Sequence, residues 1–197
     1  RGTVRRVALL GADGMLGRAF RETLAARDIA FDAFTRATLD VTDAGAIARA
    51  LDGRHDVVVN CTAYTNVDDA ETNEPLAFAI NADAVSLLAE RAKDTGARLV
   101  HFSTDYVFDG QSTAPYAVDH PRAPINAYGR SKAAGELAIE ASGAAHLIVR
   151  TSWLHAPWGK NFVLTIANLA KTRPTLRVVN DQHGRPTSVH TLAETTL

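Results

Sequence analysis

The sequence predicts an α/β protein built on a Rossmann-like, doubly wound parallel sheet. Short apolar runs alternate along the 197-residue chain with longer amphipathic stretches, as expected for buried parallel strands joined by helices. A glycine-rich turn at 11–17 directly follows the first apolar run and opens the first amphipathic stretch. Alternation of this kind places helices on both faces of the sheet, and ligands then bind beyond the carboxyl ends of the strands.

Each element follows from its own pattern. Apolar runs predict strands at 7–10, 29–34, 57–59, 99–102, 147–149 and 176–179. Helical periodicity predicts helices at 15–26, 44–52, 75–94, 131–142 and 161–171, and the stretch 191–197 also has a helical pattern. The segment 111–126 contains three prolines and is predicted to be a long irregular loop, a kind of segment that often serves a neighbouring site.

Composition limits the classes of partner. The chain is 46% hydrophobic and 22% charged, with a formal net charge of −1, which is typical of one globular unit. Its Lys and Arg residues are scattered, so we expect neither a nucleic-acid partner nor a membrane partner. No apolar stretch approaches the ~20 residues that span a bilayer. Cys61 is the single cysteine, which favours a reducing compartment and hence a cytoplasmic location.

The turn after the first strand is predicted to bind phosphate. Gly11 would allow a tight turn, Gly14 would let a pyrophosphate approach the backbone, and Gly17 would let the helix pack on the strand. The spacing G-x-x-G-x-x-G is weak evidence by itself, since such turns also occur without a nucleotide. Its place at the first strand-to-helix turn favours a dinucleotide.

The end of the second predicted strand carries Arg36 where an acidic residue would hold a ribose 2′-hydroxyl. An arginine there can pair with a 2′-phosphate, which favours NADPH and leaves NADH open. Asp40 and Val41 lie just beyond and could meet the adenine, although Asp40 could equally serve as a turn or capping residue.

Polar residues follow the third and fourth strands, at 60–65 and 103–110. Thr104 could donate a hydrogen bond to a substrate carbonyl, or merely satisfy the backbone of its turn. Tyr128 and Lys132 are four residues apart, so both can lie on one helix face. A lysine ammonium near a phenol favours the phenolate, which suits the tyrosine for acid–base catalysis.

Several longer motifs resemble the extended short-chain dehydrogenases/reductases, and within them the dTDP-4-dehydrorhamnose reductases. The resemblance covers nearly the whole chain. It rests on residues 11–17, 60–71 (NCTAYTNVDDAE), 103–110 (STDYVFDG), 128–132 (YGRSK), 150–153 (RTSW) and 180–187 (NDQHGRPT).

The resemblance implies a role for individual residues. The catalytic residues would be Thr104, Tyr128 and Lys132, and the substrate contacts Thr104, Asp105 and Trp153. Together with the residues already singled out, the cofactor contacts would be Gly11, Gly14, Met15, Leu16, Gly17, Arg36, Asp40, Val41, Ala63, Tyr64, Thr65, Tyr128 and Lys132. Asn81 matches a helix asparagine of the family's proton relay, but it could also be an ordinary polar helix residue.

Two departures from the family pattern have consequences. Some members bind magnesium through glutamates at positions that correspond here to Ala19 and His190, so we expect no structural metal. Family members are also longer. We therefore expect 1–160 to form the NAD(P)-binding domain with the catalytic residues, and 161–197 to continue the fold and begin an incomplete substrate lobe.

The family activity implied is reduction of the 4-keto group of dTDP-4-dehydro-6-deoxy-L-mannose to dTDP-L-rhamnose, with Tyr128 as proton donor. A related sugar-nucleotide epimerase stays open, and so does a non-catalytic NADP-binding subunit of the methionine adenosyltransferase type. A dehydratase is disfavoured, because it would need an acid where Tyr106 follows Thr104 and Asp105. A homodimer is also left open.

Overall fold

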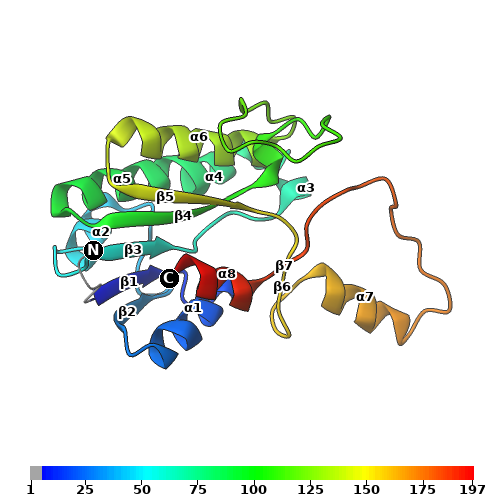
Figure 1. Cartoon of the computed structure of the whole chain (residues 1–197), viewed down its shortest axis with the longest axis horizontal. Coiled ribbons are helices and arrows are strands. Elements are labelled where there is room, and N and C mark those ends of the chain that lie inside the picture. Colours follow the sequence, from blue (N-terminus) through cyan, green and yellow to red (C-terminus); the bar gives the residue numbers. More distant parts are fainter. Residues whose placement is uncertain (1–5) are drawn as a thin grey trace.

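The computed structural model describes residues 6–197, so the first residues of the expected domain 1–160 lie outside the described part. A five-stranded parallel sheet forms its centre, with strand order β2-β1-β3-β4-β5 (Figure 1). The strands are β1 (Arg6–Leu10), β2 (Ala30–Phe34), β3 (Val57–Asn60), β4 (Arg98–Thr104) and β5 (His146–Thr151). The α/β fold class and the first five expected strands are confirmed.

The strand order reverses at β1. The chain runs from β1 outward to β2 and then returns to pair β3 with the other side of β1, with Leu10 opposite Asn60. In doubly wound sheets this reversal leaves a crevice beyond the carboxyl ends of the two strands, and ligands bind there. The glycine turn after β1 and the polar segment after β3 therefore border the same crevice.

Side chains alternate between two cores, one on each face of the sheet. Val7 and Leu9 of β1 pack with α1 (Met15–Ala26) and α8 (Val189–Thr196). Ala8 and Leu10 face the opposite way and pack with three other helices, α2 (Ala44–Ala50), α5 (Ala84–Thr95) and α6 (Ala127–Ser142). Figure 1 shows the corresponding two helical layers. The alternation explains why the central strands β1, β3 and β4 are mostly apolar, since nearly all of their residues are buried against one layer or the other.

The helices agree with the expected pattern except at their ends. α2 spans Ala44–Ala50, and α6 spans Ala127–Ser142, beginning four residues before the expected start. The Asn126 side chain accepts a hydrogen bond from the Gly129 backbone and so caps the earlier start. The expected helix 75–94 is divided into α4 (Glu74–Phe78), the π-helical turn η1 (Ala79–Asp83) and α5 (Ala84–Thr95). Two short elements, α3 (Val67–Ala70) and the 3₁₀ turn η2 (Asp105–Val107), follow strand ends.

The expected strand at 176–179 is wrong. The segment has no regular structure, and Val178 and Val179 are 49% and 68% exposed. A strand needs a neighbour to satisfy its backbone groups, and none pairs with this segment in the described structure. Instead β6 (Leu154–His155) pairs with β7 (Thr187–Ser188), and α7 (Phe162–Ala170) and the segment 171–186 project from the body (Figure 1).

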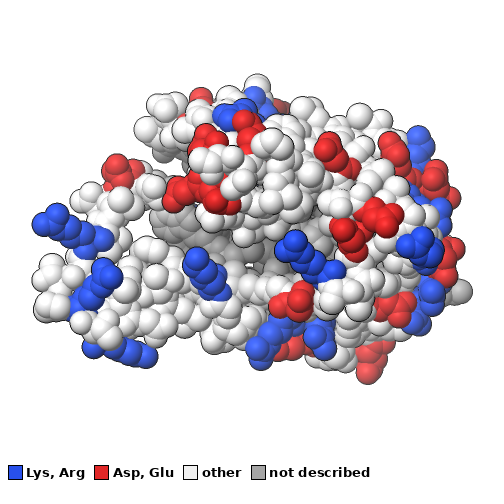
Figure 2. Space-filling model, turned by 180° about the vertical axis from the view of Figure 1, so that it is seen from behind, with Lys and Arg blue, Asp and Glu red and all other residues white. Residues whose placement is uncertain are grey.

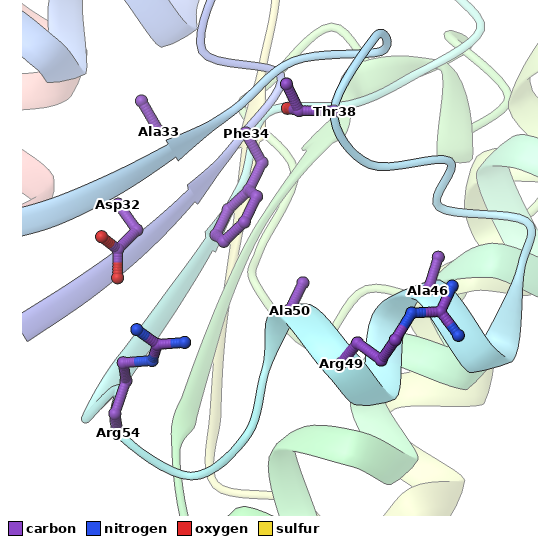
Figure 3. Close-up of a pocket in the computed structure, with 8 residues that line it drawn as sticks. All are labelled: Asp32, Ala33, Phe34, Thr38, Ala46, Arg49, Ala50 and Arg54. Atoms are coloured by element: carbon purple, nitrogen blue, oxygen red, sulfur yellow. The ribbon is translucent and has the colours of Figure 1, made fainter.

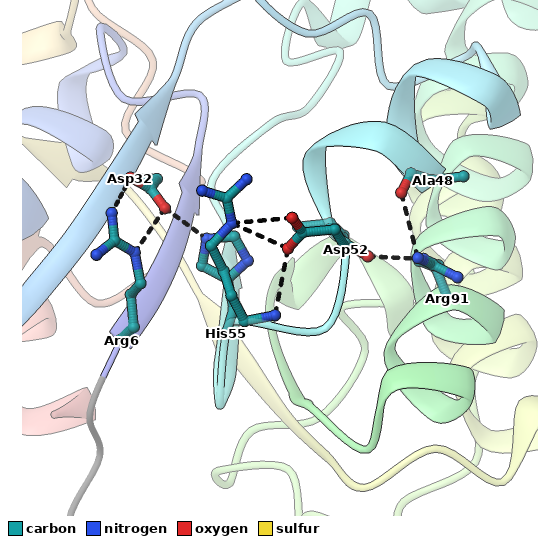
Figure 4. A network of polar contacts seen from close by, with 8 residues as sticks. Arg6, Asp32, Ala48, Asp52, His55 and Arg91 are labelled. Atoms are coloured by element: carbon teal, nitrogen blue, oxygen red, sulfur yellow. Dashed lines mark hydrogen bonds and ion pairs between the residues drawn. The ribbon is translucent and has the colours of Figure 1, made fainter.

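At the edge of the sheet opposite the crevice, Asp32 of β2 joins β1 to the loop before β3. Its carboxylate accepts hydrogen bonds from Arg6 at 2.7 and 2.5 Å and contacts His55 Nε2 at 2.8 Å (Figure 4). Nearby, Arg91 of α5 donates to the carbonyls of Leu51 and Ala48 at the end of α2. These contacts tie the outer strand and its helix to the centre of the fold.

We predict that Asp32→Asn destabilises the fold in a pH-dependent way. The hydrogen bond and charge of Arg6 hold the pKa of Asp32 well below its usual range, so the ionised group stabilises the fold at neutral pH. We expect a loss of about 1 kcal/mol, the low end for partly exposed charged hydrogen bonds. The difference from wild type should shrink as pH falls below ~4, where the unfolded chain takes up the proton.

Urea unfolding at pH 7 and pH 3 measures this difference. Asp119→Asn, in the exposed part of the loop 111–126, serves as the control and should have little effect at either pH. An Asp32→Asn loss that is equal at both pH values would contradict the ionic origin.

Candidate active site

The glycine turn after β1 is closely packed. Gly11 has φ +73°, and a Cβ there would come within 3.0 Å of the Cys61 backbone. A Cβ on Gly17 would lie 2.0 Å from the Gly11 carbonyl oxygen, far inside van der Waals contact. The first turn of α1 can therefore approach the end of β1 only because both positions lack side chains.

The amino end of α1 presents backbone donors without a side-chain acceptor. Gly14 is its N-cap and makes no side-chain capping bond, and the first turn contains no acidic residue. Gly14 and Met15 remain accessible, whereas Leu16 is buried in the core. Helix amino ends of this kind attract anions through their free N–H groups and the helix dipole. The geometry fits the predicted phosphate turn.

The turn is also held by a later segment that the sequence analysis did not single out. Trp158 Nε1 donates to the Met15 carbonyl at 3.2 Å, and the Arg18 guanidinium lies over the Trp158 ring at 4.1 Å. Asn161 Nδ2 contacts Met15 Sδ at 3.8 Å. No spacing rule links residues so distant in sequence, so this contact became visible only in the fold.

The residues expected near the adenosine end lie in the turn after β2. Arg36 is exposed, and its charge acts on Asp40. Asp40 Oδ1 accepts from the backbone and hydroxyl of Thr42, at 2.9 and 2.7 Å, and these bonds lower the pKa of Asp40. Asp40 therefore acts as a turn residue, one of the two roles expected for it. Val41 is partly buried beside the core of α2.

A pocket of about 480 Å³ lies beside this turn, between β2 and α2 (Figure 3). Thr38 lies at its upper end, and Arg49 and Arg54 contribute its cationic side chains. None of the expected catalytic residues lines it. Its lining residues are Asp32, Ala33, Phe34, Thr38, Ala46, Arg49, Ala50 and Arg54.

The segment 63–65 after β3 is fixed by Asn81. The Asn81 side chain accepts from the Tyr64 backbone N–H at 2.9 Å and donates to the Tyr64 carbonyl at 3.0 Å. It also donates to Ser131 Oγ of α6 at 3.0 Å. Ala63 and Thr65 remain exposed on either side of Tyr64, whose hydroxyl donates to Asp69. Asn81 lies in the π-helical turn, a feature that is frequent at functional sites.

The structure brings Thr104 and Tyr128 together. Thr104 ends β4, is 5% exposed, donates to Asp105 Oδ1 at 3.1 Å and accepts from the Tyr106 backbone at 3.2 Å. Its side chain also lies close enough to the Tyr128 hydroxyl to favour the phenolate. The Tyr106 ring stands edge-on to the Tyr128 ring at 5.7 Å. A hydroxyl pair with a neighbouring carboxyl thus forms at the carboxyl edge of the sheet.

The pKa of Tyr128 differs from the one expected from the sequence. Burial raises the pKa of Tyr128 to about 12, and the neighbouring Thr104 hydroxyl only partly opposes this. Burial also raises the pKa of Asp105. The expected lowering of the Tyr128 pKa by Lys132 is wrong for this conformation, because the Lys132 amino group lies against Phe102 and His101 instead.

Lys132 lies on the same helix as Tyr128 but points behind the strand ends. It is 1% exposed, and its Nζ donates to the Phe102 carbonyl at 2.6 Å and contacts His101 Nε2 at 3.2 Å. His101 Nδ1 in turn contacts Asn60 Nδ2 at 3.1 Å. The sequence analysis gave His101 no role. The sequence feature that could have pointed to His101 is its place as a polar residue within the apolar run 99–102.

A buried carboxylate supports the loop 111–126 over the site. Glu136 of α6 is 0% exposed and accepts from Arg122 of the loop at 2.6 Å and from Arg150 of β5 at 2.9 and 2.6 Å. Arg150 also donates to the Val118 carbonyl at 2.9 Å. Because a buried charge is tolerated only when paired, these contacts specify where the loop lies.

Trp153 occupies a strained position at the base of the projecting segment. Its φ is +48°, a region unfavourable for bulky residues, and its side chain is 45% exposed. Gly184 packs so closely on the indole that a Cβ would come within 2.7 Å of the ring. Ser152 Oγ donates to the Arg185 carbonyl at 2.8 Å. The segment 184–188 therefore fixes the direction of an accessible aromatic side chain, and such strain is common at functional sites.

Ala19 and His190, the two positions from which no metal site was expected, make other contacts in the structure. Ala19 is buried in the core, and His190 Nε2 lies 3.2 Å from Glu22 Oε2. Residues 6–197 contain no group of three or more His, Cys, Asp or Glu side chains arranged to hold a metal. Whether the protein works without metal stays a prediction. No helix in that part of the chain is both long and apolar enough to cross a bilayer.

The profile of the RmlD substrate binding domain family matches residues 5–197. The chain belongs to this family. Its RmlD membership agrees with the resemblance inferred from the motifs.

Named relatives support the same assignment. A dTDP-4-dehydrorhamnose reductase of Streptomyces griseus is 44% identical over 191 residues, which are 96% of this chain and 63% of that protein. One from Burkholderia thailandensis is 41% identical, over 97% of this chain and 64% of the relative. The RmlD chain described here thus spans less than two thirds of the length of these relatives.

A solved structure is similar throughout. The dTDP-4-dehydrorhamnose reductase of Bacillus anthracis, in complex with NADP, superposes with a TM-score of 0.95 at 39% identity, covering 98% of this chain and 69% of that one. The Rossmann-like arrangement of this RmlD chain is therefore shared with a nucleotide-binding protein.

We predict that Gly17→Ala destabilises the protein by about 1–3 kcal/mol, because the new methyl group overlaps the Gly11 carbonyl and forces α1 away from β1. Gly45→Ala in α2 is the matched control. Its Cβ would meet only side-chain atoms, at 3.2 and 3.3 Å, and alanine favours helix. Thermal unfolding of both variants measures the effect. Equal melting temperatures for Gly17→Ala and wild type would contradict the close packing.

Proposed function

We propose that the protein is an NADPH-dependent oxidoreductase that reduces the 4-keto group of dTDP-4-dehydrorhamnose to give dTDP-L-rhamnose. The observation that carries this proposal is the pair of neighbouring hydroxyls of Thr104 and Tyr128, with the Tyr106 ring edge-on to Tyr128. The pair lies at the same edge of the sheet as the glycine turn. A hydroxyl donor beside a dinucleotide turn is the arrangement that carbonyl reduction requires. The names of the relatives supply the substrate.

The residues of the turn fit a dinucleotide. The uncapped amino end of α1 and the close Gly11–Gly17 contact leave backbone N–H groups for a pyrophosphate. Arg36 is the exposed cation for a 2′-phosphate, which favours NADPH over NADH. Asp40, Val41 and the segment 63–65 would border the adenosine and the nicotinamide ends. When bound, NADPH supplies the hydride that reduces a carbonyl carbon.

Tyr128 and Thr104 would handle the carbonyl oxygen. The Tyr128 hydroxyl gives its proton to the oxygen as negative charge develops there, and Thr104 holds that oxygen by a hydrogen bond. At neutral pH Tyr128 is protonated, as a proton donor must be, because its pKa is raised to about 12. In the free protein Asp105 accepts the Thr104 hydroxyl hydrogen at 3.1 Å. Because a hydroxyl has one hydrogen, Thr104 would turn it from Asp105 to the substrate oxygen.

The projecting segment has the charge expected for a diphosphate substrate. Residues 156–190 contain five Lys and Arg residues against one acidic residue, Asp181, and all five cations are exposed: Lys160, Lys171, Arg173, Arg177 and Arg185. Figure 2 shows blue side chains over this segment at the left, with a hollow between it and the body. Trp153, at the base of the segment, would give the sugar or base an apolar wall.

We also propose that residues 161–197 continue the fold, with α8 packed in the core beside α1, and begin a substrate lobe. α7 is strongly apolar yet has no buried residue, and Phe162 and Val163 are 64% and 55% exposed. Exposed apolar helices are costly in water unless something covers them. The chain covers 63% and 64% of two named relatives, so the additional length of such proteins is the natural cover.

A spectrophotometric assay tests the activity. NADPH or NADH oxidation is followed with dTDP-4-dehydrorhamnose, using the protein at the length of its relatives. Substrate-dependent, stoichiometric oxidation, faster with NADPH, is the expected result. Product formed without net cofactor loss would favour an epimerase, and tight NADPH binding with no turnover would favour a non-catalytic subunit. Gel filtration of the same sample tests the homodimer, which stays a prediction.

We predict that Tyr128→Phe lowers kcat by about 10²–10⁴-fold, the usual contribution of a general acid, with little change in NADPH affinity. Tyr106→Phe is the matched control, because the Tyr106 ring lies edge-on to the Tyr128 ring. Its hydrogen bond to Thr104 comes from the backbone N–H, which the substitution keeps. Steady-state rates and a fluorescence titration with NADPH measure both properties. A Tyr128→Phe rate near that of wild type would remove Tyr128 from the donor role.

A further inference from the structure

A row of buried polar groups lies between β3 and Lys132. In the parallel register of β3 and β4, Asn60 and His101 are direct neighbours. Both strands alternate, with Val59, Val100 and Phe102 in the core under α1 and α8. Asn60 and His101 therefore point to the opposite face, toward α6. They are 1% and 0% exposed, so each hydrogen bond they make is within the protein.

The Asn60 amide has one favourable orientation. Its oxygen accepts from the Thr62 backbone N–H at 3.0 Å and from Thr62 Oγ1 at 2.6 Å. A backbone N–H can only donate, so the amide oxygen must face Thr62. The NH₂ group then faces His101 Nδ1, 3.1 Å away, and can only donate to it. His101 Nδ1 is consequently unprotonated.

This orientation determines where the proton of His101 lies. A neutral imidazole with an unprotonated Nδ1 carries its proton on Nε2. Nε2 lies 3.2 Å from Lys132 Nζ, so His101 donates toward the lysine. An ammonium has three donors and no lone pair and cannot accept this bond, whereas a neutral amine can accept it and still donate to the Phe102 carbonyl at 2.6 Å.

We propose that His101, oriented by Asn60, is a positioning residue that holds Lys132 behind the strand ends only as a neutral amine, so that protonation releases Lys132 toward Tyr128. The alternative, a charged lysine in the same place, would set two donors against each other between Nζ and Nε2. Turning both His101 and Asn60 to avoid this would leave the Thr62 N–H facing another donor. Buried donors left without acceptors cost about 1–3 kcal/mol each.

Other charged groups around Lys132 set the pH at which release occurs. Glu136, one turn further along α6, favours the ammonium, but its charge is shared with Arg122 of the loop and Arg150 of β5. Cys61, which follows Asn60, packs against the core of the other face. Burial dominates and lowers the pKa of Lys132 to about 8, so both forms are accessible near physiological pH. Burial and the lysine charge also keep the pKa of His101 well below its usual range.

The switch would control the acidity of the proton donor, an interpretation that rests on the proposed function. With Lys132 held behind the strands, Tyr128 has no cation to favour its phenolate and its pKa is about 12. A released ammonium one helical turn from Tyr128 would favour the phenolate and bring its pKa toward neutrality. Lys132 would thus support proton transfer in the released, charged state.

NMR spectroscopy tests the proposal without substrate or turnover. In ¹⁵N-labelled full-length protein above pH 9, His101 should be the Nε2–H tautomer, and its signals should shift as pH falls through the Lys132 titration. A His101 Nδ1–H tautomer under these conditions would overturn the proposal. Asn60→Asp replaces the NH₂ donor that faces His101 Nδ1 by a carboxylate oxygen, which can only accept from Nδ1–H. This variant should convert His101 to the Nδ1–H tautomer and keep protonated Lys132 in place.

A second variant adds no charge. In His101→Gln the amide oxygen can accept from the ammonium at the place of Nε2, so the pKa of Lys132 should rise by about one unit or more, a tenfold change in its proton affinity. His146→Gln, at the exposed start of β5, is the matched control and should leave the Lys132 titration unchanged. An unaltered Lys132 pKa in His101→Gln would refute the positioning role. Because neither readout involves reduction of a sugar, loss of the proposed activity and loss of the switch can be told apart.

Discussion

The parallel pairing of β1, β3 and β4 is the constraint on which the site depends. It brings the carboxyl ends of these strands to one edge and sends alternate residues to two separate cores. Gly11 meets the backbone of Cys61 across the first pair, and Asn60 meets His101 across the second. A shift of one residue in either register would exchange the two faces and separate these partners.

Buried polar groups give the site its rigidity on this frame. Asn81 clamps both backbone groups of Tyr64, and Glu136 fixes the loop 111–126 through two arginines. Such groups are stable only when every donor and acceptor is satisfied, because an unpaired buried group costs more than the bond itself gains. The same requirement explains why the protonation of Lys132 and its position are coupled. A change of one proton alters which arrangement satisfies all members of the row.

Sequence patterns predicted most of the fold because burial leaves a local signature. Strands covered on both faces are mostly apolar, and the apolar runs of the first five strands predicted them. The run 176–179 has the same signature but no neighbouring strand in the described structure, so pairing, which is not local, decided against it. The early start of α6 depends on the Asn126 cap. The predicted lowering of the Tyr128 pKa was wrong, because the four-residue spacing does not show in which direction the Lys132 side chain points.

The sequence by itself determined the α/β class, the glycine turn, and the candidate hydroxyls of Thr104 and Tyr128, because period, turn chemistry and motif order are properties of neighbouring residues. Only the tertiary structure decided that Lys132 meets His101 and Phe102, that Trp158 supports the turn at Met15, and that Gly184 orients Trp153. These contacts join residues that are 30 to 143 positions apart, from Lys132 and Phe102 to Trp158 and Met15. The direction of a buried side chain depends on which hydrogen-bonding partners the folded strands place within its reach, and no local pattern contains that information.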